Sequence, residues 1–112
     1  MDANLNTRMD AKQICQKIEE LLSAELAELK SGDQMERATY AEFVAARVVP
    51  VPIPVNFSGG ITQTCWTVTQ SDDTYSVVYL PNQGYFALCV ASDFGPLDIG
   101  VHGSALGCFA SV

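Results

Sequence analysis

Prolines at every second position constrain the middle of this chain more than any other feature. Residues 48–55 read VVPVPIPV, so Pro50, Pro52 and Pro54 are each flanked by β-branched residues. In an extended strand the N–H groups of residues i and i+2 point to the same edge, and these prolines remove the donors of one edge only. We therefore expect an edge strand that pairs on one side and forms no regular ladder on the other. A polyproline-type connector is the alternative.

The segment before the prolines has the periodicity of a long amphipathic helix over residues 10–31. Asp10 and Gln13 match a loose capping box at its start, and Ser31 with Gly32 is a typical stop. Charged side chains occupy one side of the expected helix, and apolar side chains recur at helical spacing on the other. These apolar positions are Ile14, Ile18, Leu21, Leu22, Leu26 and Leu29.

A second capping pattern follows directly. Asp33 and Glu36 have the same three-residue spacing, which predicts a shorter helix over residues 33–46. Residues 38–47 also fit an extended chain, so the sequence leaves helix and strand open there.

Residues 48–112 are predicted to be β-rich. Short apolar or alternating runs are separated by turn signals such as PNQG and SDFGP, which is typical of an antiparallel meander of about four to five strands. By length we expect one domain over residues 1–112, with a flexible N-terminus over 1–9. The expected class is α+β, with the long helix packed on the meander in a roll-like or two-layer arrangement.

Charge is distributed unevenly along the chain. The net charge is −7, and all six Lys and Arg residues precede residue 48. A nucleic-acid surface needs a basic patch that neutralises phosphates, and an anionic membrane attracts the same kind of patch. We therefore expect no nucleic-acid partner and no membrane partner. A pocket in the C-terminal part would suit a small apolar or cationic ligand.

The sequence also predicts the location of the protein and the state of its cysteines. The chain has no run of 18 apolar residues, and its polar N-terminus does not look like a signal peptide, so we expect a cytoplasmic protein. The cysteine spacings match no metal signature, and Asp72–Asp73 fits a turn better than a calcium loop, so no metal or cofactor is expected. We interpret the cysteines as buried thiols, with a disulfide as the alternative in an exported protein. They are Cys15, Cys65, Cys89 and Cys108.

Both faces of the expected meander are apolar or aromatic. The helices cover one face, so the other face, with Trp66, Tyr75, Tyr79 and Tyr85, should meet a second copy or curve around a ligand. Our first hypothesis is therefore a small non-enzymatic binding module. It would form a homodimer or higher homo-oligomer through this face and hold a neutral or cationic small ligand.

The segment FGPLDIGVHGSALGC contains the best candidate for chemistry. Asp98, His102 and Cys108 are the residue types of nucleophilic catalysis, with His as base and Asp as its orienting partner. In a regular strand, Asp98 and His102 would lie about 13 Å apart, so they meet only if Gly100 makes a sharp bulge. A small enzyme is the second hypothesis, and the sequence favours a non-enzymatic role over it. An inhibitor or immunity-type protein, whose acidic helix binds a basic partner, is the third.

Overall fold

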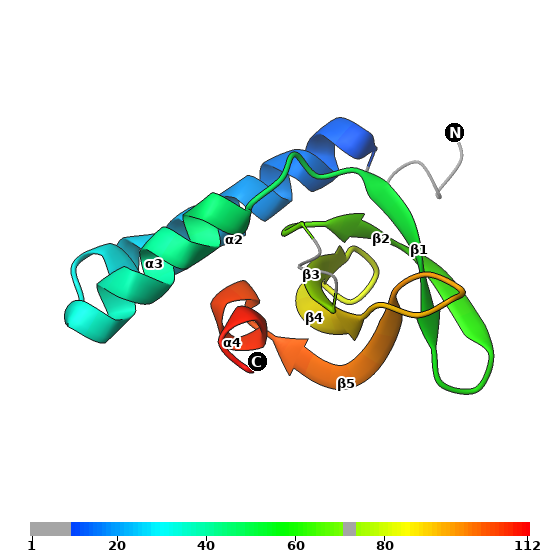
Figure 1. Ribbon diagram of the computed structural model, residues 1–112. Helices are drawn as coiled ribbons and strands as arrows, with labels where there is room; N and C mark the ends of the chain where they lie inside the picture. The colour runs from blue at the N-terminus through cyan, green and yellow to red at the C-terminus, as the bar shows by residue number, and fades with distance from the viewer. Residues whose placement is uncertain (1–9, 71–73) are drawn as a thin grey trace.

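The computed structural model describes residues 10–70 and 74–112, which form a long helical hairpin beside a small β-barrel (Figure 1). This is an α+β architecture, as the sequence predicts. The expected flexible segment 1–9 and the expected turn at Asp72–Asp73 lie outside the described residues.

Helix α2 (Ala11–Lys30) is the long amphipathic helix. The Asp10 carboxylate accepts a hydrogen bond from the Gln13 backbone N–H, and the Gln13 side chain accepts one from the Asp10 N–H, both at 2.9 Å. This reciprocal box satisfies N–H groups that a helix start leaves unpaired. The buried side of the helix consists of four residues from the predicted apolar face: Ile14, Ile18, Leu22 and Leu26.

Helix α3 (Gln34–Ala46) also begins with a capping box. Asp33 and Glu36 exchange hydrogen bonds between side chain and backbone, so the second capping pattern is also confirmed. The chain stays helical through residue 46, so residues 38–46 are helix and not the extended alternative. Arg47 then pairs with Glu19 of α2 and ties the end of the hairpin to its first helix.

Five strands follow and form one closed barrel in the order β1-β2-β3-β4-β5. Sequential neighbours pair antiparallel, as expected of a meander. With an odd number of up-and-down strands, the first and last run in the same direction, so β1 closes on β5 in parallel. The strands are β1 (Pro52–Phe57), β2 (Ile61–Thr67), β3 (Tyr75–Leu80), β4 (Tyr85–Val90) and β5 (Leu97–Gly103).

The prolines act on one edge of β1, as predicted. This strand pairs with β2 along its whole length. On its other edge the Asn56 N–H donates to the Pro96 carbonyl at 2.9 Å, and the register with β5 contains the single pair Asn56–Leu97. Pro52 and Pro54 lie on this second edge, because they precede Asn56 by two and four residues. They offer no N–H there, so the barrel closes at this seam without a regular ladder.

The two faces of the meander are buried in two different cores. Its outer face, with Trp66, Tyr79 and Phe86, packs against the helices in the main core. Its inner face lines the barrel and is not an external surface. The expected self-association face must be corrected, because Trp66 and Tyr79 are buried beneath the helices instead of being uncovered. The sequence did not show that the sheet closes on itself. The inner core consists of Val55, Cys65, Val78, Leu80, Ala87 and Cys89.

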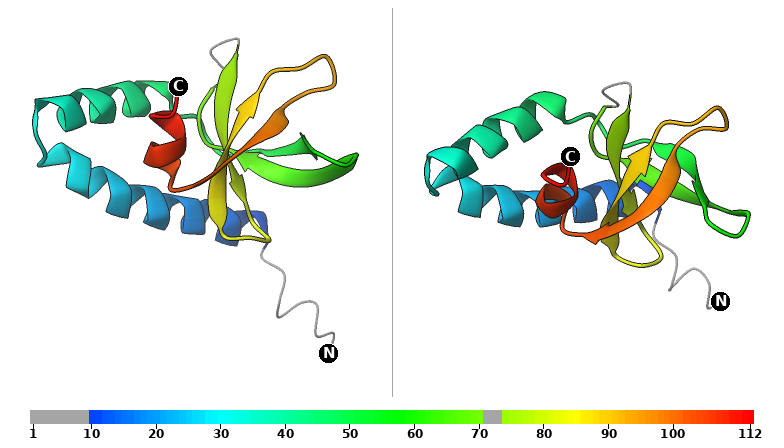
Figure 2. Two further views of the ribbon diagram at one scale, coloured as in Figure 1. Left: turned by 90° about the horizontal axis from the view of Figure 1, so that it is seen from below. Right: turned by 60° about the horizontal axis from the view of Figure 1, so that its bottom comes forward.

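The C-terminal tail forms a short helix, α4 (Ala105–Phe109), between the helical hairpin and the barrel (Figure 2). Glu25 of α2 holds its start: the carboxylate accepts hydrogen bonds from the N–H groups of Ala105 at 3.1 Å and Leu106 at 2.8 Å. Negative charge at a helix N-terminus is favourable, because the N–H groups there are unpaired. The tail thereby joins α2 to the barrel.

Candidate functional site

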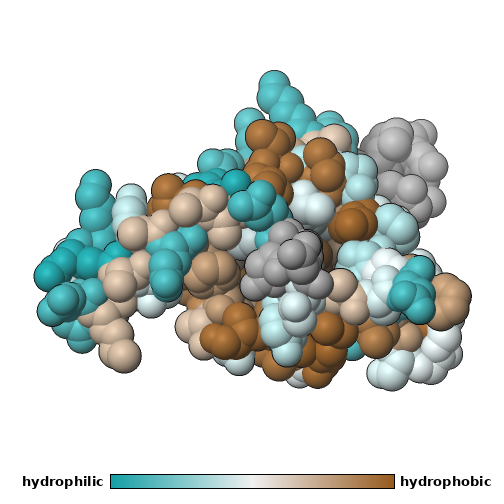
Figure 3. Space-filling model, viewed as in Figure 1, coloured by the Kyte–Doolittle hydropathy of each residue, from teal (hydrophilic) through white to brown (hydrophobic). Residues whose placement is uncertain are grey.

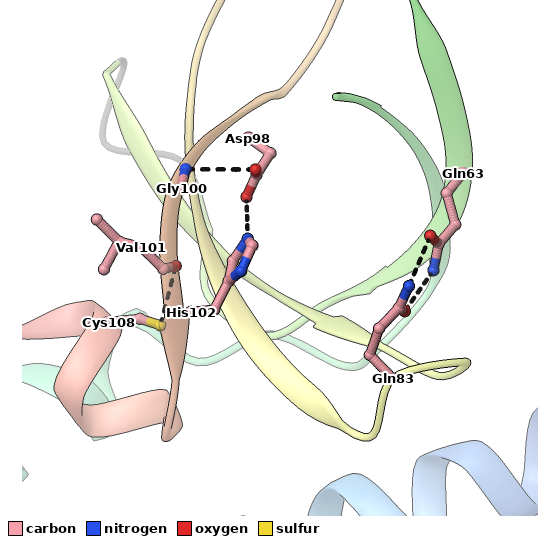
Figure 4. Close-up of polar contacts among 7 residues, drawn as sticks. All are labelled: Gln63, Gln83, Asp98, Gly100, Val101, His102 and Cys108. Atoms are coloured by element: carbon pink, nitrogen blue, oxygen red, sulfur yellow. Dashed lines mark hydrogen bonds and ion pairs between the residues drawn. The ribbon is translucent and has the colours of Figure 1, made fainter. Parts of the chain in front are cut away.

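The structure brings Asp98 and His102 together. The His102 Nε2 atom lies 2.8 Å from Asp98 Oδ1, and the Gly100 N–H donates to Asp98 Oδ2 at 3.3 Å (Figure 4). An Nε2–H that donates to the carboxylate leaves Nδ1 as the basic nitrogen of a neutral imidazole. This pair has the arrangement of a general base with an orienting carboxylate.

A bulge in β5 makes this contact geometrically feasible. Leu88 of β4 pairs with Val101 and the next residue, Cys89, pairs with Asp98, so residues 99–100 have no partner on β4. Gly100 has φ +82°, a conformation that glycine adopts without a Cβ penalty. The sequence required a bulge at this glycine for the two side chains to meet, and the bulge is present.

The pair lies on the barrel-lining face. Asp98 and His102 are opposite Cys89 and Ala87, both in the inner core, and cross-strand partners share a face. The Asp98 side chain is 8% exposed and that of His102 is 35% exposed. The Tyr85 ring stacks on the imidazole, with ring centroids 5.3 Å apart. The carboxylate is therefore shielded, while the imidazole remains within reach of solvent.

An amide pair lies on another part of the barrel wall. Gln63 of β2 and Gln83 of the β3–β4 turn exchange hydrogen bonds of 2.9 and 3.3 Å, as Figure 4 shows. Each amide uses the other as donor and acceptor, so neither is left unpaired. This end of the barrel interior is polar, whereas its middle is apolar.

Cys108 is not part of the pair. Its Sγ atom donates to the Val101 carbonyl at 3.6 Å, on the side of β5 that faces α4. Burial, then the charges of Glu25 and Asp98, raise the pKa of the Cys108 thiol to about 11. A nucleophilic cysteine needs a lowered pKa, so the structure does not assemble a Cys–His–Asp set.

The remaining cysteines are packing groups. Cys65 and Cys89 are buried in the barrel interior, where burial and then the Asp98 charge raise the pKa of each thiol to about 12. Cys15 is half-buried, and its Sγ atom lies 3.9 Å from the Pro50 carbonyl. All four cysteines are free thiols, in agreement with their interpretation as small apolar side chains.

The four aromatic residues of the expected interface do not share a surface. Trp66 and Tyr79 are 8% and 2% exposed in the core beneath the helices. Tyr75 is half-buried against the same core. Tyr85 is on the barrel-lining face beside His102. They therefore do not make one face to which a partner can bind.

The opposite end of the barrel interior opens into a groove of about 480 Å³, which we call the mouth groove. It lies where the chain enters β1, beside the end of β2, the start of β3 and the β4–β5 turn. In Figure 3, hydrophobic side chains gather over the segment that joins α3 to β1, one wall of this groove. Its apolar lining consists of Val48, Val49, Val51, Ile53, Ala91 and Pro96.

The polar part of the groove lining is uncharged. Thr67 Oγ1 accepts from the Val51 N–H at 3.0 Å, and Thr69 Oγ1 accepts from the Val77 N–H at 2.9 Å. Within the described residues, the Gln70 side-chain amide and the Ser76 hydroxyl have no hydrogen-bond partner. The groove thus combines apolar walls with two available polar groups.

Sequence reasoning missed this groove. Its walls come from segments some 40 residues apart, 48–53 and 91–96. The available signal was the valine-rich proline run in a half of the chain that lacks Lys and Arg. That signal indicates an uncharged edge strand but does not reveal which loop faces it.

Comparison with protein-family models, curated proteins and solved structures found no match for this chain. Across residues 10–70 and 74–112, no helix has the length and apolar character needed to cross a membrane. The same residues contain no cluster of three or more His, Cys, Asp or Glu side chains suited to a metal ion.

Proposed function

We propose that this protein is a non-enzymatic binding module whose mouth groove holds an uncharged, largely apolar ligand group, and that it works as a homo-oligomer. The observation that carries the proposal is the groove itself, with its apolar walls and the unpaired Gln70 amide and Ser76 hydroxyl. Ligand sites are typically about 300–1,000 Å³, mostly apolar with a few polar groups, and barrel mouths are common places for them. A groove of about 480 Å³ lies within that range.

The lining favours a neutral ligand over an ion. The described lining contains no Lys, Arg, His, Asp or Glu. A buried charge is costly unless it is paired, so an anion or a cation would lose hydration in the groove without gaining a partner. Of the two ligand types expected from the sequence, the neutral one fits better.

The lining also favours binding over catalysis. Acid–base and nucleophilic mechanisms need a titratable or nucleophilic group in contact with the substrate. Among the described lining residues, only uncharged hydroxyl and amide groups are available. Neither Asp98 nor His102 is among these lining residues.

A dye titration tests the binding proposal. Nile red is neutral and apolar, and its fluorescence should rise with wild-type protein. Ala91→Trp places a large ring in the groove and should weaken dye binding by about tenfold or more. Ala24→Trp, on the exposed side of α2, is the matched control and should bind like wild type. Equal binding by both variants, or no binding by wild type, would contradict the proposal.

The Asp98–His102 distance of 2.8 Å favours a second candidate, a small hydrolytic enzyme. In this candidate His102 would take a proton from water, and Asp98 would orient the imidazole. The test is hydrolysis of p-nitrophenyl acetate by wild type and His102→Gln, both checked for folding. Equal rates would remove this candidate. The third hypothesis, an acidic inhibitor of a basic partner, stays a prediction.

A further inference from the structure

Phe94 is the most exposed large apolar side chain among the described residues, at 89%. It belongs to the β4–β5 turn, and three neighbouring residues, Ser92, Gly95 and Pro96, line the mouth groove. An exposed aromatic ring therefore lies directly beside an open apolar groove. Exposed apolar groups that gather in this way commonly mark an interaction site.

Hydrogen bonds fix the turn that carries Phe94. Ser92 Oγ accepts from the Phe94 N–H at 3.2 Å and donates to the Gly95 carbonyl at 2.5 Å. The Gly95 N–H donates to the Ser92 carbonyl at 3.1 Å, with Gly95 at φ +103°. The backbone thus holds the ring in solvent, outside the chain's own groove.

Asn56 ties this turn to the β1–β2 hairpin. Its Nδ2 atom donates to the Phe94 carbonyl at 3.0 Å, and its Oδ1 atom accepts from Thr62 Oγ1 at 3.1 Å. A side chain presented on a fixed backbone loses less conformational entropy when it binds. Rigidly held aromatic residues are also the usual anchors of protein interfaces.

We infer that the group bound in the mouth groove is Phe94 of a second copy of this chain. This inference rests on the proposed function, because it needs a groove that accepts an apolar group. The ring and the groove are neighbours on one surface, so a twofold axis between two copies places each ring over the other groove. Such an isologous contact is closed and satisfies both copies at once.

The sizes of ring and groove are compatible. A closed apolar cavity of about 150 Å³ holds a benzene molecule. The groove, at about 480 Å³, accommodates a phenyl ring with room for part of the turn that carries it. Its apolar lining replaces the water that surrounds the exposed ring.

Charge opposes the association of two copies. Each chain carries a net charge of −7, so two copies repel each other over most approaches. The described lining of the groove is uncharged, and like charges placed opposite each other would cost binding energy. The residues from 48 onward carry four Asp and no Lys or Arg, and Asp93 directly precedes Phe94, so repulsion also opposes the contact at this end. Added salt screens the remaining repulsion and should strengthen the dimer.

Sedimentation equilibrium over a concentration series tests the inference. Wild type should dimerise, and Phe94→Ser should raise the dimer Kd by about thirtyfold or more. Ile61→Ser is the matched control, because Ile61 is also exposed (61%) but does not line the groove. A monomeric wild type, or a Phe94→Ser variant that dimerises like wild type, would overturn the inference.

A mixing experiment guards against misfolded variants. Ala91→Trp keeps its Phe94 ring but has a blocked groove, whereas Phe94→Ser keeps its groove but lacks the ring. Each variant alone should be monomeric, while the mixture should form a heterodimer through one intact ring-and-groove contact. If the mixture stays monomeric although each variant has the wild-type circular dichroism spectrum, the inference is wrong.

Nile red binding by the variants distinguishes a failure of this inference from a failure of the proposed function. Phe94→Ser should bind the dye at least as tightly as wild type, because no partner ring competes for its groove. If wild type is monomeric and still binds the dye in a way that Ala91→Trp weakens, the binding function stands and the second-copy inference falls. If Ala91→Trp leaves dye binding unchanged, the proposed function itself falls.

Discussion

Asp98 and His102, four residues apart on one strand, are joined at 2.8 Å across a bulge that excludes residues 99–100 from the β4 ladder. Two side chains that a regular strand would keep far apart therefore meet on the barrel-lining face. The contact depends on the backbone at Gly100, which has a positive φ. Its geometry is well defined, and Cys108 bonds the Val101 carbonyl instead of joining the pair.

Replacing Gly100 should test how the bulge is held. A Cβ at this position meets nothing within 4 Å, so the cost of Gly100→Ala comes from its φ of +82° alone. We expect a loss of about 1–2 kcal/mol in the free energy of unfolding. Urea denaturation measures the loss, and NMR should show displaced amide signals for Asp98 and His102.

Gly59→Ala is the matched control for this substitution. Gly59 also has a positive φ (+85°) and open space at its Cβ, but it lies in the β1–β2 turn. It should cost a similar amount of stability and leave the β5 signals in place. If Gly100→Ala leaves both stability and the β5 signals unchanged, the bulge does not depend on this glycine.

Glu25 should be the residue that holds α4 in place. Its carboxylate bonds the N–H groups of Ala105 and Leu106, both in buried residues. Because hydrogen bonds to charged groups contribute about 1.5–3 kcal/mol, Glu25→Ala should lower the free energy of unfolding by about that amount. Glu28→Ala, one turn along on the exposed surface, should change it little. Equal effects would show that the cap is not a stabilising contact.

Buried thiols should make the fold less stable at alkaline pH. The pKa of Cys89 is raised from 9.0 to about 12 by burial first and then by nearby negative charge, so the folded state keeps this proton when the unfolded state has lost it. Stability is therefore fully present below pH 9 and falls as pH rises from about 9 towards 12. The slope is about 1.4 kcal/mol per pH unit for each such thiol.

Urea denaturation between pH 8 and pH 11 measures this slope. Tyrosines and lysines titrate in the same range, so the informative quantity is the difference between wild type and Cys89→Ala. The variant should be less stable at pH 8, and its stability should fall less steeply at higher pH. Parallel curves for the two proteins would contradict the assigned cause.

Local features of the fold were predictable from the sequence. The capping pairs at Asp10 and Asp33 fix both helix starts through contacts within one turn, and the alternating prolines determine the edge of β1. The need for a bulge at Gly100 also follows from the sequence, because strand geometry alone sets the separation of Asp98 and His102. Each of these inferences uses interactions over a few residues.

Long-range features were not predictable. Closure of the meander into a barrel depends on β1 meeting β5, about 40 residues later, and it buries one face of the sheet as the inner core. The other face, with Trp66 and Tyr79, is the one that the helices cover. The mouth groove depends on the same closure. The position of Cys108 depends on Glu25, some 80 residues before it, which orients α4. Side-chain periodicity within a strand contains none of this information.

An NMR titration of wild-type protein with N-acetylphenylalaninamide, a neutral mimic of a phenylalanine residue, tests the central claim most directly. If the mouth groove binds this compound, the amide signals of Val49, Gln70 and Ser92 should shift along one common saturation curve as its concentration rises. The signal of His102, near the other end of β5, should stay in place. A saturable shift confined to His102, or no saturable shift in the groove, would contradict a binding role for the mouth groove.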